Sequence, residues 1–172
     1  GYGTNAAFED SLDENAYAEA ADALLQWLRR AVPDASLIVM GPPDLARFPR
    51  YAGRDNTNAC RALTAEEREN YTALVRERSR RLARWHPPVM LRAVRRALQF
   101  AARQNGGFFW DWSKAMGGPC SIHTWVHAKP RLASGDHRHF TAAGARKSAR
   151  MLFRTLMNTY ETFRAGLAQA RR

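Results

Sequence analysis

The sequence predicts an α/β fold built on a parallel sheet, because helix-like and strand-like segments alternate along the chain. A helical pattern after Ser11 precedes a short apolar run at residues 36–40, and a second one through Met90 precedes an aromatic run at residues 108–112. A helix followed by a short apolar strand is the repeating unit of parallel sheets. With 172 residues, 45% of them apolar, the chain fits one domain spanning residues 1–172.

The N-terminal elements follow from capping and breaking signals. Residues 1–10 read as the end of a strand followed by a loop. Ser11 and Glu14 have the spacing of a capping box, which predicts a helix that ends before Pro33. The apolar run at residues 36–40 predicts a strand buried on both faces.

The middle of the chain is more polar. Residues 45–62 predict an irregular surface loop. Thr64 and Glu67 form a second capping-box pattern, which predicts one charged helix to about Trp85, exposed on most sides. The Pro87-Pro88 pair then starts the next helix.

The last elements are read in the same way. Gly106-Gly107 ends the preceding helix, and residues 108–112 form a strand. A short helix runs through Trp125. The final helix begins at Thr141 and is expected to bury the apolar residues at helical spacing, namely Leu152, Phe153, Leu156, Tyr160 and Phe163.

Two strands and a stub at Gly1 make a small sheet for so many apolar helix faces. This points to a doubly wound sheet whose first strands are missing from the chain.

The net charge of +11 comes almost entirely from arginine. Attraction to a nucleic acid or to an anionic envelope glycan would explain it. We favour solvated helix faces, since the charges are spread over helices and no nucleic-acid-binding motif accompanies them. No run approaches the ~20 apolar residues of a membrane span.

Cys60 and Cys120 are the only cysteines. They allow one disulfide in an oxidising compartment, and two free thiols are equally consistent with the sequence.

The segment at residues 136–144 is the strongest candidate for chemistry. Asp136 precedes His139 by three residues in a turn just ahead of a helix, so its carboxylate can lie beside the imidazole. Such a carboxylate fixes the tautomer of a histidine that acts as general base. His137 is expected to point elsewhere. The alternative is a solvated polar turn capped by Thr141.

An ordered set of motifs resembles the SGNH/GDSL hydrolases, and most closely the envelope branch that includes peptidoglycan O-acetylesterases. The matching segments are Gly3-Thr4-Asn5, residues 37–44, residues 109–112, residues 115–121, Trp125 and the segment Asp136 to Thr141. They span nearly the whole chain apart from residues 45–87. Ala6 departs from the family, where many members have an acidic residue. The resemblance implies a three-layer, flavodoxin-like parallel sheet whose N-terminal strands lie outside this chain.

By the same resemblance, Asn5 donates its amide to the developing oxyanion, and His139 and Asp136 are two members of a Ser-His-Asp triad. A helix or turn cap is the alternative for Asn5. Gly3 belongs to the oxyanion segment, and the Met116-Gly117-Gly118 loop could shape the acyl pocket or be a simple turn. The resemblance implies no cofactor and no metal.

The nucleophilic serine of that family lies upstream of the first matching motif, so we expect it to be absent here and the chain alone to be inactive. None of the internal candidates has the sequence context of a nucleophile: Ser11, Ser36, Ser113, Ser121, Ser134, Ser148 and Cys120.

His123 and His127 have a spacing that can bind zinc on one helix face, but the sequence offers no third ligand, so a plain helix surface is favoured. Similarly, Trp110, Trp112 and Trp125 could stack on sugars, and core packing is the favoured role for most of them.

The sequence therefore predicts part of a serine esterase that removes O-acetyl groups from an envelope glycan such as peptidoglycan, in the periplasm or cell envelope. Its expected partners are the ester substrate and the missing N-terminal segment of the same protein, and nucleic acid is not favoured. The alternative is a non-catalytic glycan-binding module, or pseudoenzyme, with the same fold.

Overall fold

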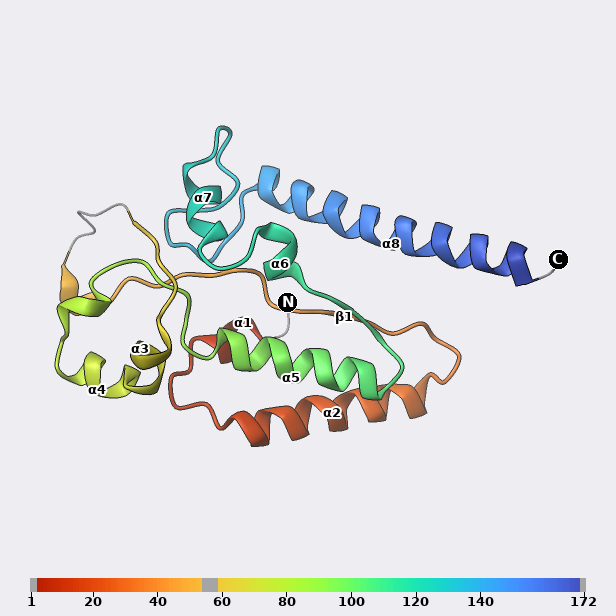
Figure 1. Ribbon diagram of the computed structural model, residues 1–172, viewed down its shortest axis with the longest axis horizontal. Helices are drawn as coiled ribbons and strands as arrows, with labels where there is room; N and C mark the ends of the chain where they lie inside the picture. The colour runs from red at the N-terminus through yellow and green to blue at the C-terminus, as the bar shows by residue number, and fades with distance from the viewer. Residues whose placement is uncertain (1–2, 54–58, 171–172) are drawn as a thin grey trace.

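The computed structural model describes residues 3–53 and 59–170 (Figure 1). The fold mixes helices with one small sheet. In chain order the elements are α1 (Thr4–Ala7), α2 (Glu14–Ala31), β1 (Ile38–Met40), the 3-10 helix η1 (Arg50–Ala52), α3 (Ala65–Glu69), α4 (Tyr71–Arg76), the 3-10 helix η2 (Arg80–Leu82), α5 (Leu91–Gln104), β2 (Phe108–Trp110), α6 (Trp112–Met116), α7 (Ser121–His127) and α8 (Ala142–Ala170).

Strands β1 and β2 pair in parallel, with Val39 opposite Phe109, which confirms the predicted parallel pairing. In Figure 1, α2 and α5 lie on one side of the strands, and α6, α7 and the start of α8 lie on the other. Val39 packs in a core cluster with Leu25 of α2 and Val94 of α5. The prediction that β1 is buried on both faces is wrong, since Ile38 is 44% exposed. Side chains alternate along a strand, and α2 and α5 cover the face that carries Val39.

The segment ahead of α2 also differs from the prediction. Residues 4–7 form the short helix α1 rather than a loop, and Gly1 lies outside the described residues. The carboxylate of Asp13, not the hydroxyl of Ser11, caps α2 by accepting the N–H groups of residues 15 and 16, each at 3.0 Å. The Ser11 hydroxyl donates instead to Glu9, at 2.6 Å. A carboxylate at this end of a helix is favoured by the helix dipole as well as by the hydrogen bonds.

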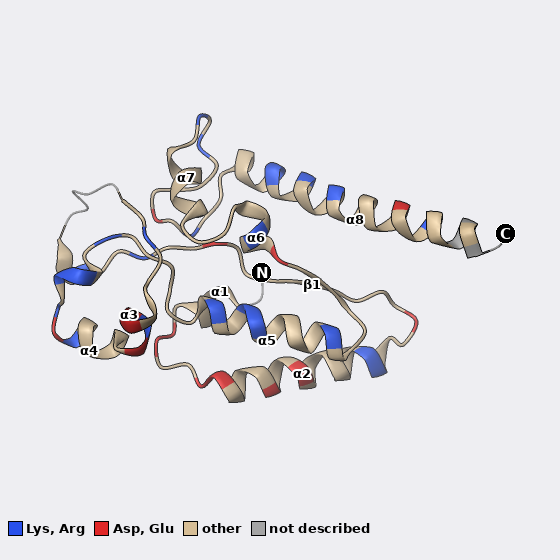
Figure 2. Cartoon of the chain, viewed as in Figure 1, with Lys and Arg blue, Asp and Glu red and all other residues tan. Residues whose placement is uncertain are grey.

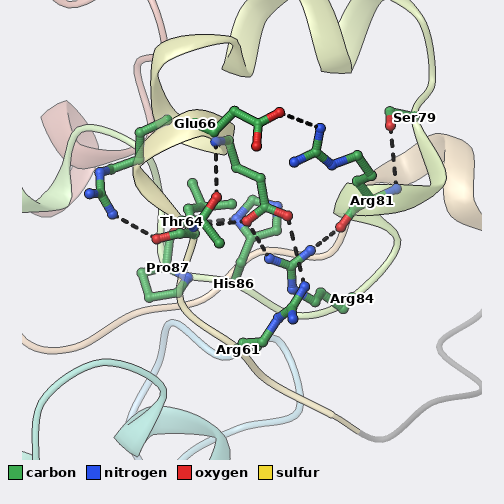
Figure 3. A network of polar contacts seen from close by, with 11 residues as sticks. Arg61, Thr64, Glu66, Ser79, Arg81, Arg84, His86 and Pro87 are labelled. Carbon is green, nitrogen blue, oxygen red and sulfur yellow. Dashed lines mark hydrogen bonds and ion pairs between the residues drawn. The ribbon is translucent and has the colours of Figure 1, made fainter.

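The Thr64 and Glu67 capping box is confirmed, but the single helix predicted to run to Trp85 is wrong. The chain folds back on itself as α3, α4 and η2. The carboxylate of Glu67 is buried, and it accepts from the Thr64 N–H at 2.8 Å and from Arg84 at 2.7 Å. Figure 3 shows this network, in which Arg61 precedes the Thr64 cap and Arg84 lies near the end of the segment. Leu63, Tyr71, Leu74 and Leu82 form a small core within this segment, so the segment is not exposed on most sides.

The break after α4 has a local cause. The N–H of Ser79 donates to the Leu74 carbonyl and the N–H of Arg78 to the Val75 carbonyl, which is the hydrogen-bond pattern of a Schellman ending. Arg78 takes the left-handed conformation, at φ 52°. Glycine usually fills that position, and an arginine there gives no stop signal in the sequence.

The next helix, α5, begins at Leu91, a few residues after the proline pair that was predicted to start it. It ends as predicted. Gly106 has φ 63°, and the N–H of Gly107 donates to the Ala102 carbonyl at 2.7 Å. Strand β2 is shorter than predicted, because Asp111 leaves the strand to cap α6 through the Lys114 N–H.

Helix α8 projects from the rest of the molecule over most of its length (Figure 1). Its start is anchored, since Thr141 caps it and the Ser148 hydroxyl accepts from the Trp112 indole at 3.1 Å. The predicted burial of its apolar residues is wrong for Phe153, Tyr160 and Phe163, which are 63%, 51% and 60% exposed. Within the described residues, no helix is long and apolar enough to cross a membrane.

A second core cluster includes the buried apolar residues of α7. Ala46, Ile122 and Trp125 are fully or almost fully buried there, with Phe140 packed against them. Leu45 and Ala46 are completely buried, so the prediction of a surface loop fails at the start of residues 45–62; residues 54–58 of that loop lie outside the described residues. Cys60 and Cys120 form a disulfide, which ties the loop to α7 and settles the alternative that the sequence left open.

Candidate active site

The turn at residues 134–139 holds Asp136 and His139 in direct contact. The Asp136 Oδ2 atom lies 2.5 Å from the His139 Nδ1 atom. The Oδ1 atom accepts the N–H groups of Arg138 and His139, at 3.0 and 3.1 Å. Because the carboxylate accepts at Nδ1, the neutral ring carries its proton there and leaves Nε2 with a lone pair. That is the arrangement of a general base whose partner fixes its tautomer.

Asp136 remains ionised throughout the neutral range. Partial burial by itself would raise its pKa, but the hydrogen bonds from the His139 ring and from the two backbone N–H groups outweigh it, and the pKa is lowered from its ordinary value. The carboxylate can therefore stabilise a positive charge that forms on His139 when the ring takes a proton.

His137 is buried and holds the turn in place through its contacts. As predicted, it points away from His139. Its ring is 3% exposed and stacks on Trp85, with centroids 3.5 Å apart. Its Nδ1 atom lies 2.9 Å from the Gly135 carbonyl, and its own carbonyl accepts the Ala46 N–H at 3.2 Å. The turn is thus tied to buried parts of the chain, whereas the His139 side chain is 78% exposed.

His139 and Asn5 line one hollow of about 440 Å³. Asn5 belongs to α1, far from His139 in sequence. Its carboxamide makes no hydrogen bond to any other described residue, and the N-cap of α1 is Gly3, so the cap alternative for Asn5 is not supported. Its amide is available to donate to a ligand. The remaining lining residues are Thr4, Phe8, Pro43, Trp112, Arg138 and Phe140.

Gly3 is not among the residues that line this hollow. It has φ 91°, and a Cβ atom there would lie 2.7 Å from Val94 Cγ1. Only a glycine allows α1 to pack this closely on α5, so Gly3 positions Asn5 rather than lining the hollow. A direct contact between Gly3 and a substrate stays a prediction.

The Met116-Gly117-Gly118 loop is not part of this hollow either. Met116 is 7% exposed, and Met116 and Gly117 line a separate hollow of about 530 Å³ beside α7 and Lys147. Trp112, at the other end of α6, is the residue that reaches the Asn5 and His139 hollow. A role of this loop in binding substrate also stays a prediction.

From the sequence, Trp112 is considered only as a possible sugar-stacking residue and Pro43 is not assigned to the site, although both have a positional signal. Pro43 follows β1 and Trp112 follows β2. The carboxyl ends of neighbouring parallel strands meet at one edge of the sheet, where α/β proteins place their sites. Phe8 and Arg138 gave no such signal.

The other nucleophile and metal candidates lie elsewhere. Cys120 is oxidised in the disulfide, and Ser113 and Ser121 are buried. No serine or cysteine of the described residues lines the hollow. The His123 Nδ1 atom lies 2.8 Å from the His137 Nε2 atom, so these rings pair with each other. The described residues contain no group of histidine, cysteine or carboxylate side chains arranged to hold a metal ion.

No protein-family model and no curated protein matches the sequence. A solved structure of a peptidoglycan O-acetylesterase is similar to this chain, with a TM-score of 0.67 and 25% sequence identity. The likeness covers 93% of this chain and 36% of the other, so the chain spans about a third of that protein's length. The chain therefore shares its fold with part of an esterase.

Proposed function

We propose that this chain is part of a serine esterase of the SGNH type, which removes O-acetyl groups from an envelope glycan such as peptidoglycan. The observation that carries the proposal is the contact between Asp136 and His139 at the rim of a hollow that Asn5 also lines. The Asn5 amide has no hydrogen-bond partner among the described residues. A base, its orienting carboxylate and an oxyanion donor are three of the four parts of a serine esterase site.

Each residue has one role in this proposal. The Nε2 atom of His139 takes the proton from a serine hydroxyl as the serine oxygen bonds to the acetyl carbon. Asp136 stabilises the imidazolium, and the Asn5 amide donates to the carbonyl oxygen as it becomes negative. The proton then passes to the glycan oxygen as the ester bond breaks. Water, activated by the same ring, hydrolyses the acetyl-serine to acetate and restores the serine.

The serine itself is proposed to lie outside these 172 residues. Supporting this, the described lining of the hollow has no serine, and the solved esterase is a longer chain than this one. By this proposal the chain alone has no esterase activity, and activity requires the segment that carries the nucleophile. The residual rate from binding and the oxyanion donor would be small.

An envelope location follows from the proposed substrate. The Cys60 to Cys120 disulfide supports it, since disulfides persist in oxidising compartments such as the periplasm. The basic composition, with a net charge of +11, suits an anionic polymer. Figure 2 shows these cations spread over α5, α8 and the loops near α4 rather than gathered in one patch.

The test is acetate release from O-acetylated peptidoglycan by the full-length protein, with de-O-acetylated peptidoglycan as control. The proposal predicts release from the acetylated polymer only. Binding to both polymers without any acetate release would favour the second candidate, a glycan-binding module of the same fold, which the absence of a serine among the described lining residues also favours.

A further inference from the structure

Arg138 stands in the same hollow as Asn5 and His139. Its guanidinium carbon lies 3.8 Å from the centroid of the Phe8 ring, which is a close cation–π contact. Its backbone N–H donates to Asp136, so the backbone that carries this side chain is fixed by the same turn that fixes His139. The guanidinium is thereby held at a defined place beside the base.

The Phe8 ring beneath this guanidinium is held in place by contacts of its own. The ring packs against the buried residues Ala7, Leu45 and Leu91. The Phe8 carbonyl accepts from the Arg47 Nη2 atom at 2.7 Å. Movement of the ring would break its packing against these buried residues, so Arg138 lies over a surface that is already in place.

Among the described residues, two guanidinium groups approach the Phe8 ring, and one of them has an anionic partner there. Arg47, at 5.2 Å from the centroid, is paired with Asp10 at 2.6 Å. Arg138 has no ion pair within the described part of the chain. The nearby carboxylate of Asp136 is already engaged by His139 and by two backbone N–H groups. The charge of Arg138 is therefore left for a ligand.

The geometry indicates which ligand group suits it. A guanidinium that stacks by its face keeps its N–H edges free, and these edges form a fork that matches a carboxylate. The hollow, about 440 Å³, is at the small end of ligand sites. A carboxylate at Arg138 and an ester at His139 must then sit on the same sugar or on adjacent sugars.

We propose that Arg138 binds a carboxylate on the sugar whose ester His139 acts on, so that the substrate is an O-acetylated acidic glycan. This rests on the esterase function proposed above. Arg138 is a specificity-determining residue in this account. It takes no part in proton transfer.

The test compares acetate release by the full-length protein from two esters: O-acetylated N-acetylmuramic acid and its carboxyl methyl ester, in which the charge is removed and one methyl group is added. Arg138→Gln is expected to raise KM for the acid by about tenfold, the typical worth of a hydrogen bond to a charged group. It should leave KM for the methyl ester and both kcat values unchanged. Arg138→Lys should recover part of the loss, and Arg154→Gln, an equal charge change on exposed α8, should behave as wild type.

Two results would overturn the inference. One is an unchanged KM for the acid in Arg138→Gln. The other is an equal loss on both esters, which would mean that Arg138 only holds the turn against Phe8. An acidic stem peptide without sugar serves as competitor, and strong competition would assign the site to peptide carboxylates instead.

Calorimetric titration with unacetylated N-acetylmuramic acid separates this inference from the esterase proposal, because it needs no catalysis. Binding that is lost in Arg138→Gln, in a protein inert to every ester, would contradict the esterase proposal and support the carboxylate site. Active protein with binding that is insensitive to Arg138 would contradict the carboxylate site alone.

Discussion

Asp136 and His139 are joined twice, through the side chains and through the backbone. One carboxylate oxygen lies 2.5 Å from the His139 Nδ1 atom, and the other accepts the His139 N–H at 3.1 Å. The carboxylate therefore fixes both the position of the histidine backbone and the orientation of its ring. A pair separated by three residues can be positioned in this way by one turn, without help from a distant element.

Replacing Asp136 tests the orienting role. Asp136→Asn is expected to lower kcat of the full-length protein by about 10³-fold or more, because an amide donates toward the ring, favours the wrong tautomer and cannot stabilise the imidazolium. Esterase kinetics on p-nitrophenyl acetate measure it. Asp34→Asn, on an exposed turn before β1, is the matched control. A loss of less than about twofold in Asp136→Asn would remove Asp136 from the mechanism, since loss of a functioning orienter is far larger.

Replacing Asn5 tests the oxyanion donor. Asn5→Ala should lower kcat by about 10²–10³-fold with little change in KM, because the amide acts only when charge develops on the carbonyl oxygen. Stability should be unchanged, since the carboxamide has no hydrogen bond within the described residues. Asn15→Ala on the exposed face of α2 is the control. An increase in KM at constant kcat would instead identify Asn5 as a simple binding residue.

Asp44 gives the stability a defined pH dependence. Its carboxylate is buried, accepts from the Ile122 N–H at 3.0 Å and from the Ser121 hydroxyl at 3.3 Å, and has one oxygen without a partner in the described chain. Burial raises its pKa from 3.8 to about 6, against the opposing effect of those hydrogen bonds. Between these two values the folded protein keeps a proton that the unfolded chain releases. The free energy of unfolding therefore falls as the pH rises through this window.

Asp44→Asn should abolish this decrease in the free energy of unfolding at higher pH. The amide oxygen can still accept from Ile122, and no charge is buried. We expect the variant to be more stable than wild type at about pH 8, by about 2–3 kcal/mol at most, and equally stable at about pH 4. Urea denaturation at both pH values measures this. A variant that is less stable at the higher pH would show that the charged carboxylate contributes net stability.

The features that the sequence predicted correctly are those set by residues close together along the chain. The apolar runs at residues 36–40 and 108–112 predicted the paired strands, the spacing of Thr64 and Glu67 predicted a cap, and the spacing of Asp136 and His139 predicted their contact. The cap and the contact depend on side chains a few residues apart, and the strands depend on short apolar runs that each follow a helix.

The predictions that failed depended on competition between neighbouring residues for one role, or on contacts with residues distant in the sequence. Asp13 and Ser11 both suit a helix start, and only the carboxylate reaches the free N–H groups of α2. Arg78 ends α4 in a conformation that its residue type does not signal. Helical spacing in α8 predicted a covered face, but periodicity does not say what covers it, and Phe153 is exposed.

The most direct test of the account is p-nitrophenyl acetate hydrolysis by the full-length protein and its His139→Ala variant. His127→Ala, at the exposed last residue of α7, is the control for loss of an imidazole. The account predicts that His139→Ala lowers kcat/KM by about 10³-fold or more, with the control at the wild-type value. A His139→Ala variant with wild-type kcat/KM would contradict the assignment of His139 as the base.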